Sequence, residues 1–289
     1  MERKFYLIAK ACIYFTILSI LWGAWVRISG SGNGCGSSWP LCGGVIIPEA
    51  EHKKTWIEFI HRLMTGFLGV WILGLWGYVF KNSVKFSLNT KIFSYVILVL
   101  TIIESLLGAL LVKKELVVDN TSVLRVIIVG FHQVNTLLLL GALTIFVASL
   151  TEIGIKKFRS VKISQWLVIL FYLTAAAFGA IAALSSTLFP SSSLYDGIMK
   201  DLNPQQHLTM QLRAFHPAVG ILFLSCCWWL RSIIGNRAVL FILSVTLIGV
   251  FNLLLLSPVY LKLTHLAVVD FAWVTVCSHI FGGSALKNS

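Results

Sequence analysis

WIEFIHRLMTGFLGVWILGLWGYVF, residues 56–80, is the stretch that decides the fold. An apolar run of about 20 residues is long enough to cross the hydrocarbon core of a bilayer as a helix. Its first turns nevertheless hold Glu58, His61 and Arg62. Ionisable groups inside a membrane-spanning segment are costly, and they mark functional sites. This run therefore predicts an integral membrane protein and places a candidate site near the N-terminal end of one helix.

The composition of the whole chain points the same way. It has 289 residues, of which 57% are hydrophobic and 12% are charged, whereas soluble domains carry about 25% charged residues. Seven other apolar runs have similar lengths, so we expect an all-α integral membrane protein with eight transmembrane helices. The predicted helices cover residues 5–28, 56–80, 91–112, 123–150, 163–186, 209–234, 237–257 and 260–281.

The distribution of charge predicts how the chain crosses the membrane. The net charge of +12 comes mostly from Lys and Arg at the ends of apolar runs, which indicates membrane orientation and not nucleic-acid binding. The basic side would carry Arg3, Lys4, Lys10, Lys81, Lys85, Lys91, Lys156, Lys157, Arg159, Lys162, Arg231, Arg237 and Lys287. The opposite side would carry Glu49, Glu51, Glu115, Asp119, Asp196 and Asp201. We expect both termini in the cytoplasm and the long first and fifth loops outside, in the cytoplasmic (inner) membrane of a bacterium.

Four histidines recur at matching places in this pattern. One lies near the start of each even-numbered apolar run, so all four should lie at one depth, one to two turns below the outer surface. They are His61, His132, His216 and His265. Chance would scatter four histidines over different depths, so the pattern indicates a shared role.

The chain also shows an internal repeat. Residues 1–150 and residues 151–289 follow the same plan of four helices, with a long loop after the first and a histidine early in the second and fourth. Gly23-Ala24-Trp25 is echoed by Gly179-Ala180-Ile181, and the residues before His61 align with those before His216. Both halves start on the same side, so the repeat is parallel. We expect two pseudo-symmetric four-helix bundles.

Paired histidines on facing helices suit haem iron. Imidazole is a standard axial ligand of haem, and helix bundles hold such groups between side chains that project inward. The sequence thus predicts one haem in each half, held by His61 and His132 and by His216 and His265. Zinc fits less well, because neither C-x-x-C nor H-E-x-x-H is present.

Glu58 distinguishes the two halves. It lies three residues before His61, on the same helix face, whereas Arg213 takes that place before His216. A carboxylate beside a haem can accept protons or stabilise a developing cation, so we expect the first half to carry out chemistry and the second to support it. The alternative is that Glu58 merely favours the helix dipole.

Several other polar residues have more than one reading. Arg27 and Arg62 suit haem propionates or reach the interface as snorkelling side chains. Glu104 and Asp270 belong to a proton path or are simply hydrogen-bonded. In a Gly-rich outer loop, Cys35 and Cys42 should form a disulfide in an oxidising compartment, either as a structural staple or as a redox-active pair.

Together these motifs resemble the haem A synthase family, and the resemblance covers essentially the whole chain. Its most specific part runs through Gly23-Ala24-Trp25-Val26-Arg27, the Cys35–Cys42 loop with its Trp39-Pro40-Leu41-Cys42 end, and Glu58-Phe59-Ile60-His61-Arg62. The resemblance implies an oxidoreductase that converts a ring methyl of haem O to a formyl group, through hydroxylated intermediates, for cytochrome oxidase assembly. It also implies that Glu58 is catalytic, that His61 and His132 flank the substrate haem O, and that His216 and His265 ligate a resident haem b.

The resemblance extends to partners and has two departures. It implies haem O synthase as the substrate donor and a quinone or a redox protein as electron acceptor, with membrane lipid around the chain; a homo-oligomer is compatible with the sequence. The fifth loop lacks the second cysteine pair of many bacterial members, and Pro217 stands where the family usually has Arg, so Arg213 is a candidate replacement for that propionate contact. A competing reading is a two-haem membrane cytochrome that takes electrons from quinol.

Overall fold

The computed structural model describes residues 3–49, 52–151, 154–156 and 160–283. Its secondary structure is helical, and eight spans are long and apolar enough to cross a membrane, which confirms the predicted number. These spans are α1 (Arg3–Ile28), α2 (Lys53–Lys81), α3 (Leu88–Lys113), α4 (Val123–Ser149), α5 (Ile163–Leu188), the joined pair α7 (Leu208–Arg213) and α8 (Phe215–Trp229), α10 (Asn236–Leu254) and α11 (Val259–Phe281).

The sixth span differs from the single run predicted at 209–234. Helix α7 ends at Arg213 and α8 begins at Phe215. Pro217 explains the break, because proline lacks an N–H and its ring clashes with the carbonyl four residues earlier, which is that of Arg213. The end of the predicted run is a separate short helix, α9 (Arg231–Ile234).

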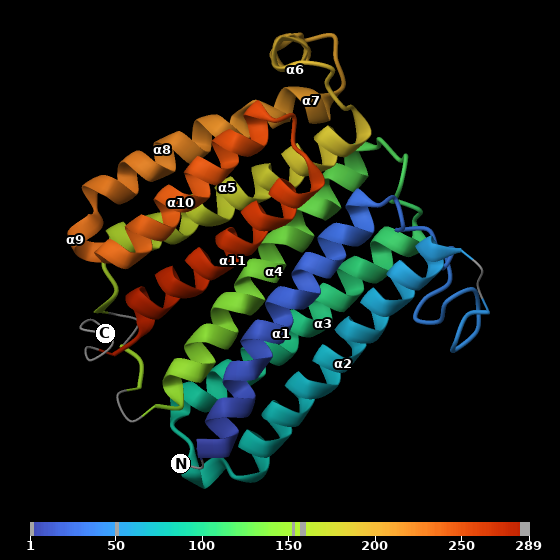
Figure 1. The fold of residues 1–289 in the computed structure, drawn as a ribbon. Helices are drawn as coiled ribbons and strands as arrows, with labels where there is room; N and C mark the ends of the chain where they lie inside the picture. The colour runs from blue at the N-terminus through green and yellow to red at the C-terminus, as the bar shows by residue number, and fades with distance from the viewer. Residues whose placement is uncertain (1–2, 50–51, 152–153, 157–159, 284–289) are drawn as a thin grey trace.

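The fifth loop contains a helix that the sequence reading missed, α6 (Leu194–Leu202). Ser193 caps its start by accepting the backbone N–H of Asp196. Lys200, one turn later, lies 2.9 Å from the Asp196 carboxylate, and this hydrogen bond lowers the pKa of Asp196 below its usual value. Nine residues are too few to cross a membrane, and α6 lies next to α7, beyond the ends of the spans (Figure 1).

The spans pack as two neighbouring groups (Figure 1). Helices α1, α2, α3 and α4 contact one another in a ring, and α5, α8, α10 and α11 do the same. The groups meet where α4 contacts α5 and α11 and where α1 contacts α11. The division into residues 1–150 and 151–289 as two pseudo-symmetric halves stays a prediction.

The joint between the groups centres on Trp273 of α11. Its side chain is fully buried, and its indole N–H donates to the backbone carbonyl of Leu137 on α4 at 2.6 Å. Gly141 lies against the same ring, since a Cβ there would come within 3.1 Å of the indole nitrogen. Small residues allow helices to approach closely inside a membrane, where lipid gives no hydrophobic drive for association. The two groups are therefore held by close packing and an interhelical hydrogen bond.

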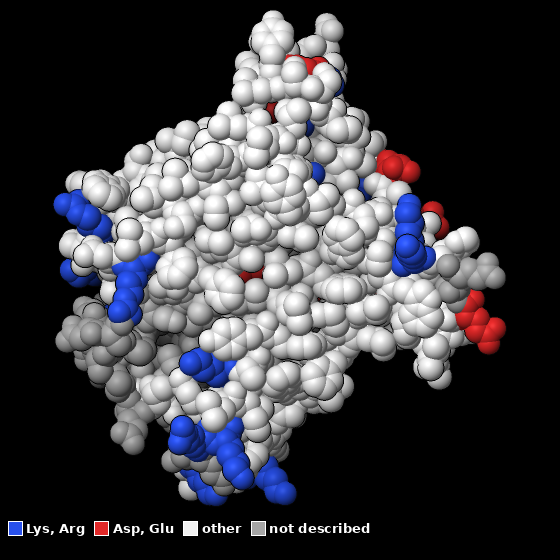
Figure 2. Space-filling model, viewed as in Figure 1, with Lys and Arg blue, Asp and Glu red and all other residues white. Residues whose placement is uncertain are grey.

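The two ends of the molecule differ in their loops and charges. We call the end that carries residues 29–49 and 189–207 the loop end, and the end that carries Arg3 and Phe281 the terminal end. On the face in Figure 2, Lys and Arg gather at the terminal end, while Asp and Glu appear with a few basic residues at the loop end. Among the charged residues used to predict orientation, Glu51, Lys157, Arg159 and Lys287 lie outside the described residues.

Candidate functional site

The four predicted ligands lie toward the loop end of the bundle. His61 is on α2, His132 on α4, His216 on α8 and His265 on α11. Each follows the start of its span by roughly two turns of helix. The main hydrophobic core lies on the other side of them, toward the terminal end, and includes Ile72, Phe146, Trp273 and Ile280. The histidines therefore occupy one layer of the molecule, which is the geometry that the sequence pattern predicts.

Each histidine ring packs against a glycine of the preceding span, which we call its seat glycine. A Cβ added to the seat glycine would lie 2.9 Å from Cε1 of His61 or of His216, 3.1 Å from Cε1 of His265 and 4.0 Å from Cε1 of His132. In the same order the seat glycines are Gly23, Gly179, Gly249 and Gly108. The echo between residues 23–25 and 179–181 now has a physical reason, because a larger side chain would push the ring away.

The second pair has the spacing of two ligands on one iron. The ring centres of His216 and His265 are 6.2 Å apart. Two axial imidazoles place their ring centres about 6 Å apart, because each metal–nitrogen bond is about 2 Å long and the ring centre lies about 1 Å further on. In the first pair, His132 is close enough to His61 to act on it electrostatically. The donor sets of both pairs, and the spacing of the second pair, thus fit haem iron.

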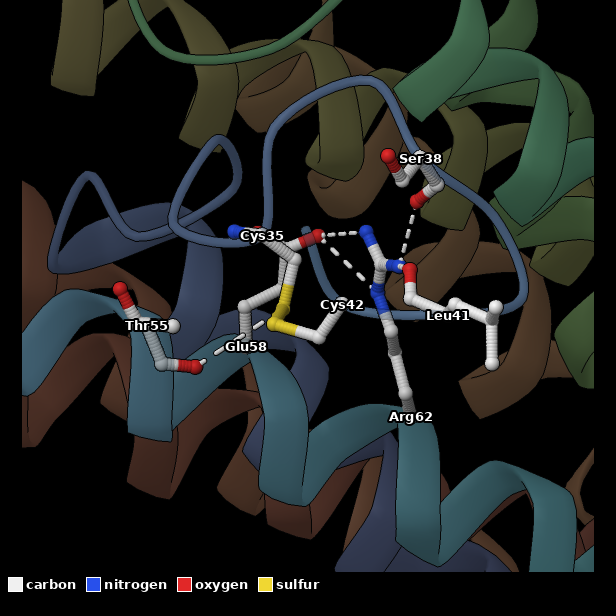
Figure 3. Close-up of a disulfide and its surroundings, with 7 residues drawn as sticks. All are labelled: Cys35, Ser38, Leu41, Cys42, Thr55, Glu58 and Arg62. Atoms are coloured by element: carbon white, nitrogen blue, oxygen red, sulfur yellow. Dashed lines mark hydrogen bonds and ion pairs between the residues drawn. A yellow bond between two sulfur atoms is a disulfide. The ribbon is translucent and has the colours of Figure 1, made fainter. Parts of the chain in front are cut away.

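Glu58 is buried against the disulfide loop (Figure 3). Cys35 and Cys42 form the predicted disulfide. Glu58 is only 3% exposed. Its Oε2 accepts the backbone N–H of Cys35 at 2.8 Å, and its Oε1 lies 2.5 Å from Nη2 of Arg62. A carboxylate has about four lone-pair sites, so these contacts leave acceptor capacity for a further proton donor.

Arg62 holds the same loop in place. Its Nη1 donates to the backbone carbonyls of Ser38 and Leu41, each at 2.6 Å, while Nε and Nη2 donate to Glu58 (Figure 3). An Arg62 contact with a propionate would have to replace some of these bonds. The structure therefore assigns Arg62 a loop-fastening role, and the propionate contact stays a prediction.

Arg213 fastens the other long loop in a comparable way. Its Nε donates to Asp201 at 2.8 Å, and its Nη2 lies 2.5 Å from the same carboxylate. Weaker contacts reach the carbonyls of Phe189 and Gly197. Each half thus has one arginine paired with one acid at the base of its long loop. The pairing was not predicted, because Asp201 is twelve residues away from Arg213 and nothing in their spacing connects them.

Arg27 is the candidate propionate ligand that keeps a free donor. Its Nε is buried and has no hydrogen-bond partner among the described residues. Arg125 of α4 and Lys262 of α11 lie near enough to act on it electrostatically. The sequence reading missed both. Both are basic residues at the loop end of a span, where the orientation predicted from the positive-inside rule leaves few basic residues. That unexpected position could have identified them.

Asp270 and Glu104 have different surroundings. Asp270 on α11 is fully buried, and neither of its carboxylate oxygens has a hydrogen-bond partner in the part of the chain that the structure describes. Glu104 on α3 accepts hydrogen bonds from Asn135 and Thr136 of α4. Glu104 is therefore hydrogen-bonded between two helices, and a role in a proton path stays a prediction for both acids.

Comparisons with known proteins agree with the motifs. Relatives named heme A synthase include that of Exiguobacterium sibiricum, 36% identical over 111 residues (38% of this chain and 36% of that protein), and that of Alkalihalophilus pseudofirmus, 38% identical over 95 residues (32% and 31%). Proteins of two Thermus thermophilus strains named protoheme IX farnesyltransferase are 31% identical over 287 residues. That match covers 92% of this chain and 46% of theirs, so the chain spans about half the length of these relatives.

The family assignment rests on a longer match than any of the heme A synthase alignments. Residues 6–277 match the family described as cytochrome oxidase assembly protein (COX15-CtaA). That range includes the four histidines of the site, the disulfide loop and Glu58. The chain belongs to this cytochrome oxidase assembly protein family.

Proposed function

We propose that the chain is a haem A synthase, which oxidises a ring methyl of haem O to a formyl group through hydroxylated intermediates. The observation that carries the proposal is the asymmetry between two similar histidine pairs. Only the first has a buried glutamate one turn away on the same helix, held against a disulfide loop. The family match and the relatives named heme A synthase support the same activity.

Glu58 is the proposed catalytic residue. Conversion of a methyl to a formyl group with an oxygen atom from water releases four protons and four electrons, so the site needs a proton acceptor. A positioned carboxylate can take a proton from water or stabilise positive charge on the substrate as electrons leave. Arg62 and the Cys35 amide hold Glu58 in place for either role.

We assign His61 and His132 to the substrate haem O, and His216 and His265 to a resident haem b. A resident haem b would supply one-electron transfer away from the substrate. Its electrons would pass to a quinone or a redox protein. Arg27, with Arg125 and Lys262 beside it, offers positive charge for propionates at the meeting point of the two halves, residues 1–150 and 151–289.

We infer that the loop end faces outward and the terminal end faces the cytoplasm of a bacterium. The basic residues at the terminal end support this orientation. So does the disulfide at the loop end, because disulfides persist on the oxidising side of a bacterial membrane. Haem O, which is largely apolar apart from its propionates, would then reach the site from the membrane, with haem O synthase as the donor.

The name of the Thermus thermophilus relatives suggests a second activity, the farnesylation of protohaem IX. More than half of each of those proteins lies outside the match. The part that does match belongs to the cytochrome oxidase assembly protein family, which favours methyl oxidation over prenyl transfer.

The products of the reaction test the proposal. Membranes that contain the full chain are supplied with haem O, and the extracted haems are separated by chromatography and identified by mass. We expect haem A together with hydroxylated intermediates. A haem b spectrum with neither product would support the alternative, a membrane cytochrome that takes electrons from quinol, and haem O formed from protohaem IX would support prenyl transfer.

The resident haem can be tested through its seat glycine. Gly179→Ala places a methyl group 2.9 Å from Cε1 of His216, so the ring has to move and the ligand bond should weaken. We expect a loss of bound haem b of about 10-fold or more, since displaced ligand geometry costs this much at metal sites. The measurement is the haem b absorption of the purified protein.

Gly77→Ala is the control, because Gly77 lies on α2, sixteen residues beyond His61 toward the terminal end, and a Cβ there meets nothing within 4 Å. It should keep full haem content. If Gly179→Ala also kept the haem b content and spectrum of the wild type, the assignment of His216 would be wrong.

A further inference from the structure

Glu104 of α3 faces the ring of His132 across the first half. Its Oε1 lies 3.4 Å from Nδ1 of His132 and accepts the hydroxyl of Thr136. Its Oε2 accepts the side-chain amide of Asn135 at 2.7 Å. The 3.4 Å contact is in ion-pair range without the geometry of a hydrogen bond, and Nδ1 has no hydrogen-bond partner among the described residues. The carboxylate is therefore placed to become that partner.

The position of Glu104 can be compared among the four histidines by counting from the seat glycine on each preceding helix. Glu104 precedes Gly108 by four residues, which is one turn of the helix. Ala175 stands four residues before Gly179, and there the backbone carbonyl takes the contact, 3.1 Å from Nδ1 of His216. The four equivalent positions are Ser19, Glu104, Ala175 and Val245. Only one of them supplies a carboxylate.

The other two positions confirm how unusual Glu104 is. The carbonyl of Val245 faces His265 at a geometry too poor for a hydrogen bond. The Ser19 hydroxyl donates to the carbonyl of Phe15, and Nδ1 of His61 has no hydrogen-bond partner in the described structure. Three histidines thus have a neutral group or nothing behind the ring, and His132 has a negative charge.

A carboxylate behind a metal-bound imidazole changes the metal. It accepts the ring N–H, fixes the tautomer and orientation of the ring, and makes the ligating nitrogen more basic. A more basic ligand favours the more positive oxidation state of the iron. The hydrogen bond from Asn135 to Oε2 holds the carboxylate on the His132 side, while the Thr136 hydroxyl shares Oε1 with the histidine.

We propose that Glu104 is a positioning residue that accepts the Nδ1–H of His132 and so strengthens this ligand to the iron of the substrate haem. The inference rests on the proposed function, since it needs haem between His61 and His132. The first half then differs from the second in two groups: Glu58 beside His61 on α2, and the carboxylate behind His132 on α4. The iron of the first half is then biased toward the ferric state relative to the iron held by His216 and His265.

The test is a redox titration of the full-length protein loaded with haem in both sites, followed by absorption. Glu104→Gln keeps the shape and removes the charge. We expect one of the two midpoint potentials to become more positive, by about 59 mV for each tenfold loss of ferric preference, with haem retained. The other potential should not move, so it serves as an internal reference.

Thr136→Val is the matched second variant. It removes the hydroxyl that competes for Oε1, so more of the carboxylate's charge acts on His132, and the same potential should become more negative. Opposite shifts support the inference, because damage to the fold would not give opposite signs. Shifts in the same direction, or none in either variant, overturn it. A wild-type protein that binds no haem in the first half would instead overturn the proposed function.

Discussion

Glu58→Gln is expected to lower haem A formation by about 100-fold or more, the usual contribution of a positioned acid or base, while both haems stay bound. The amide can still accept the Cys35 N–H in place of the carboxylate, but it cannot take a proton at neutral pH or balance a positive charge. The measurement is the yield of haem A and hydroxylated haem per protein, with haem content determined on the same sample.

The control for this variant is Asp201→Asn. Asp201 is the acid that pairs with Arg213 at the base of the other long loop, so its substitution loosens a comparable contact without touching the first half. We expect haem A formation close to that of the wild type. Full activity in Glu58→Gln would remove the catalytic role and leave Glu58 as a fastening for the disulfide loop.

Trp273→Ala is expected to destabilise the protein by about 3–5 kcal/mol, the usual cost of removing a large aromatic side chain from a packed core. The ring fills the joint between α4 and α11, and its N–H donates to the carbonyl of Leu137. Thermal unfolding in detergent, compared with the wild type, provides the measurement.

Two further variants separate the causes of that loss. Trp273→Phe keeps much of the packing and removes the N–H, so it should cost about 1 kcal/mol, the net value of one hydrogen bond. Trp229→Ala removes a tryptophan that is 82% exposed, and it should stay within about 0.5 kcal/mol of the wild type. Equal stabilities for Trp273→Ala and Trp229→Ala would mean that the joint does not hold the halves together.

The spans could be predicted because hydropathy is a local property of the chain. An apolar run of sufficient length has to form a helix in lipid, since each backbone polar group needs a partner within the segment. The same reasoning placed the four histidines in one layer. It failed for the sixth span, which was predicted as one helix over residues 209–234, although the structure divides it three residues before Pro217.

The contacts around the site could not be predicted in the same way. Glu58 and His61 share a helix, so their proximity follows from spacing, but Asp201 reaches Arg213 only through the path of a loop that contains α6. Glu104 and His132 are on different helices, and their contact depends on how α3 and α4 are rotated against each other. Contacts between side chains on different helices belong to the tertiary structure. The hydrophobic periodicity of a single sequence does not reveal them.

The joint at Trp273 has a consequence for traffic through the protein. Rigid-body separation of the two halves would leave the indole N–H of Trp273 without its partner, and an unsatisfied polar group in hydrocarbon costs several kcal/mol. The two halves are therefore not expected to open and close against each other as rigid bodies. For the proposed haem sites, we expect exchange to require movement of helices within one half, and not an opening between the two halves.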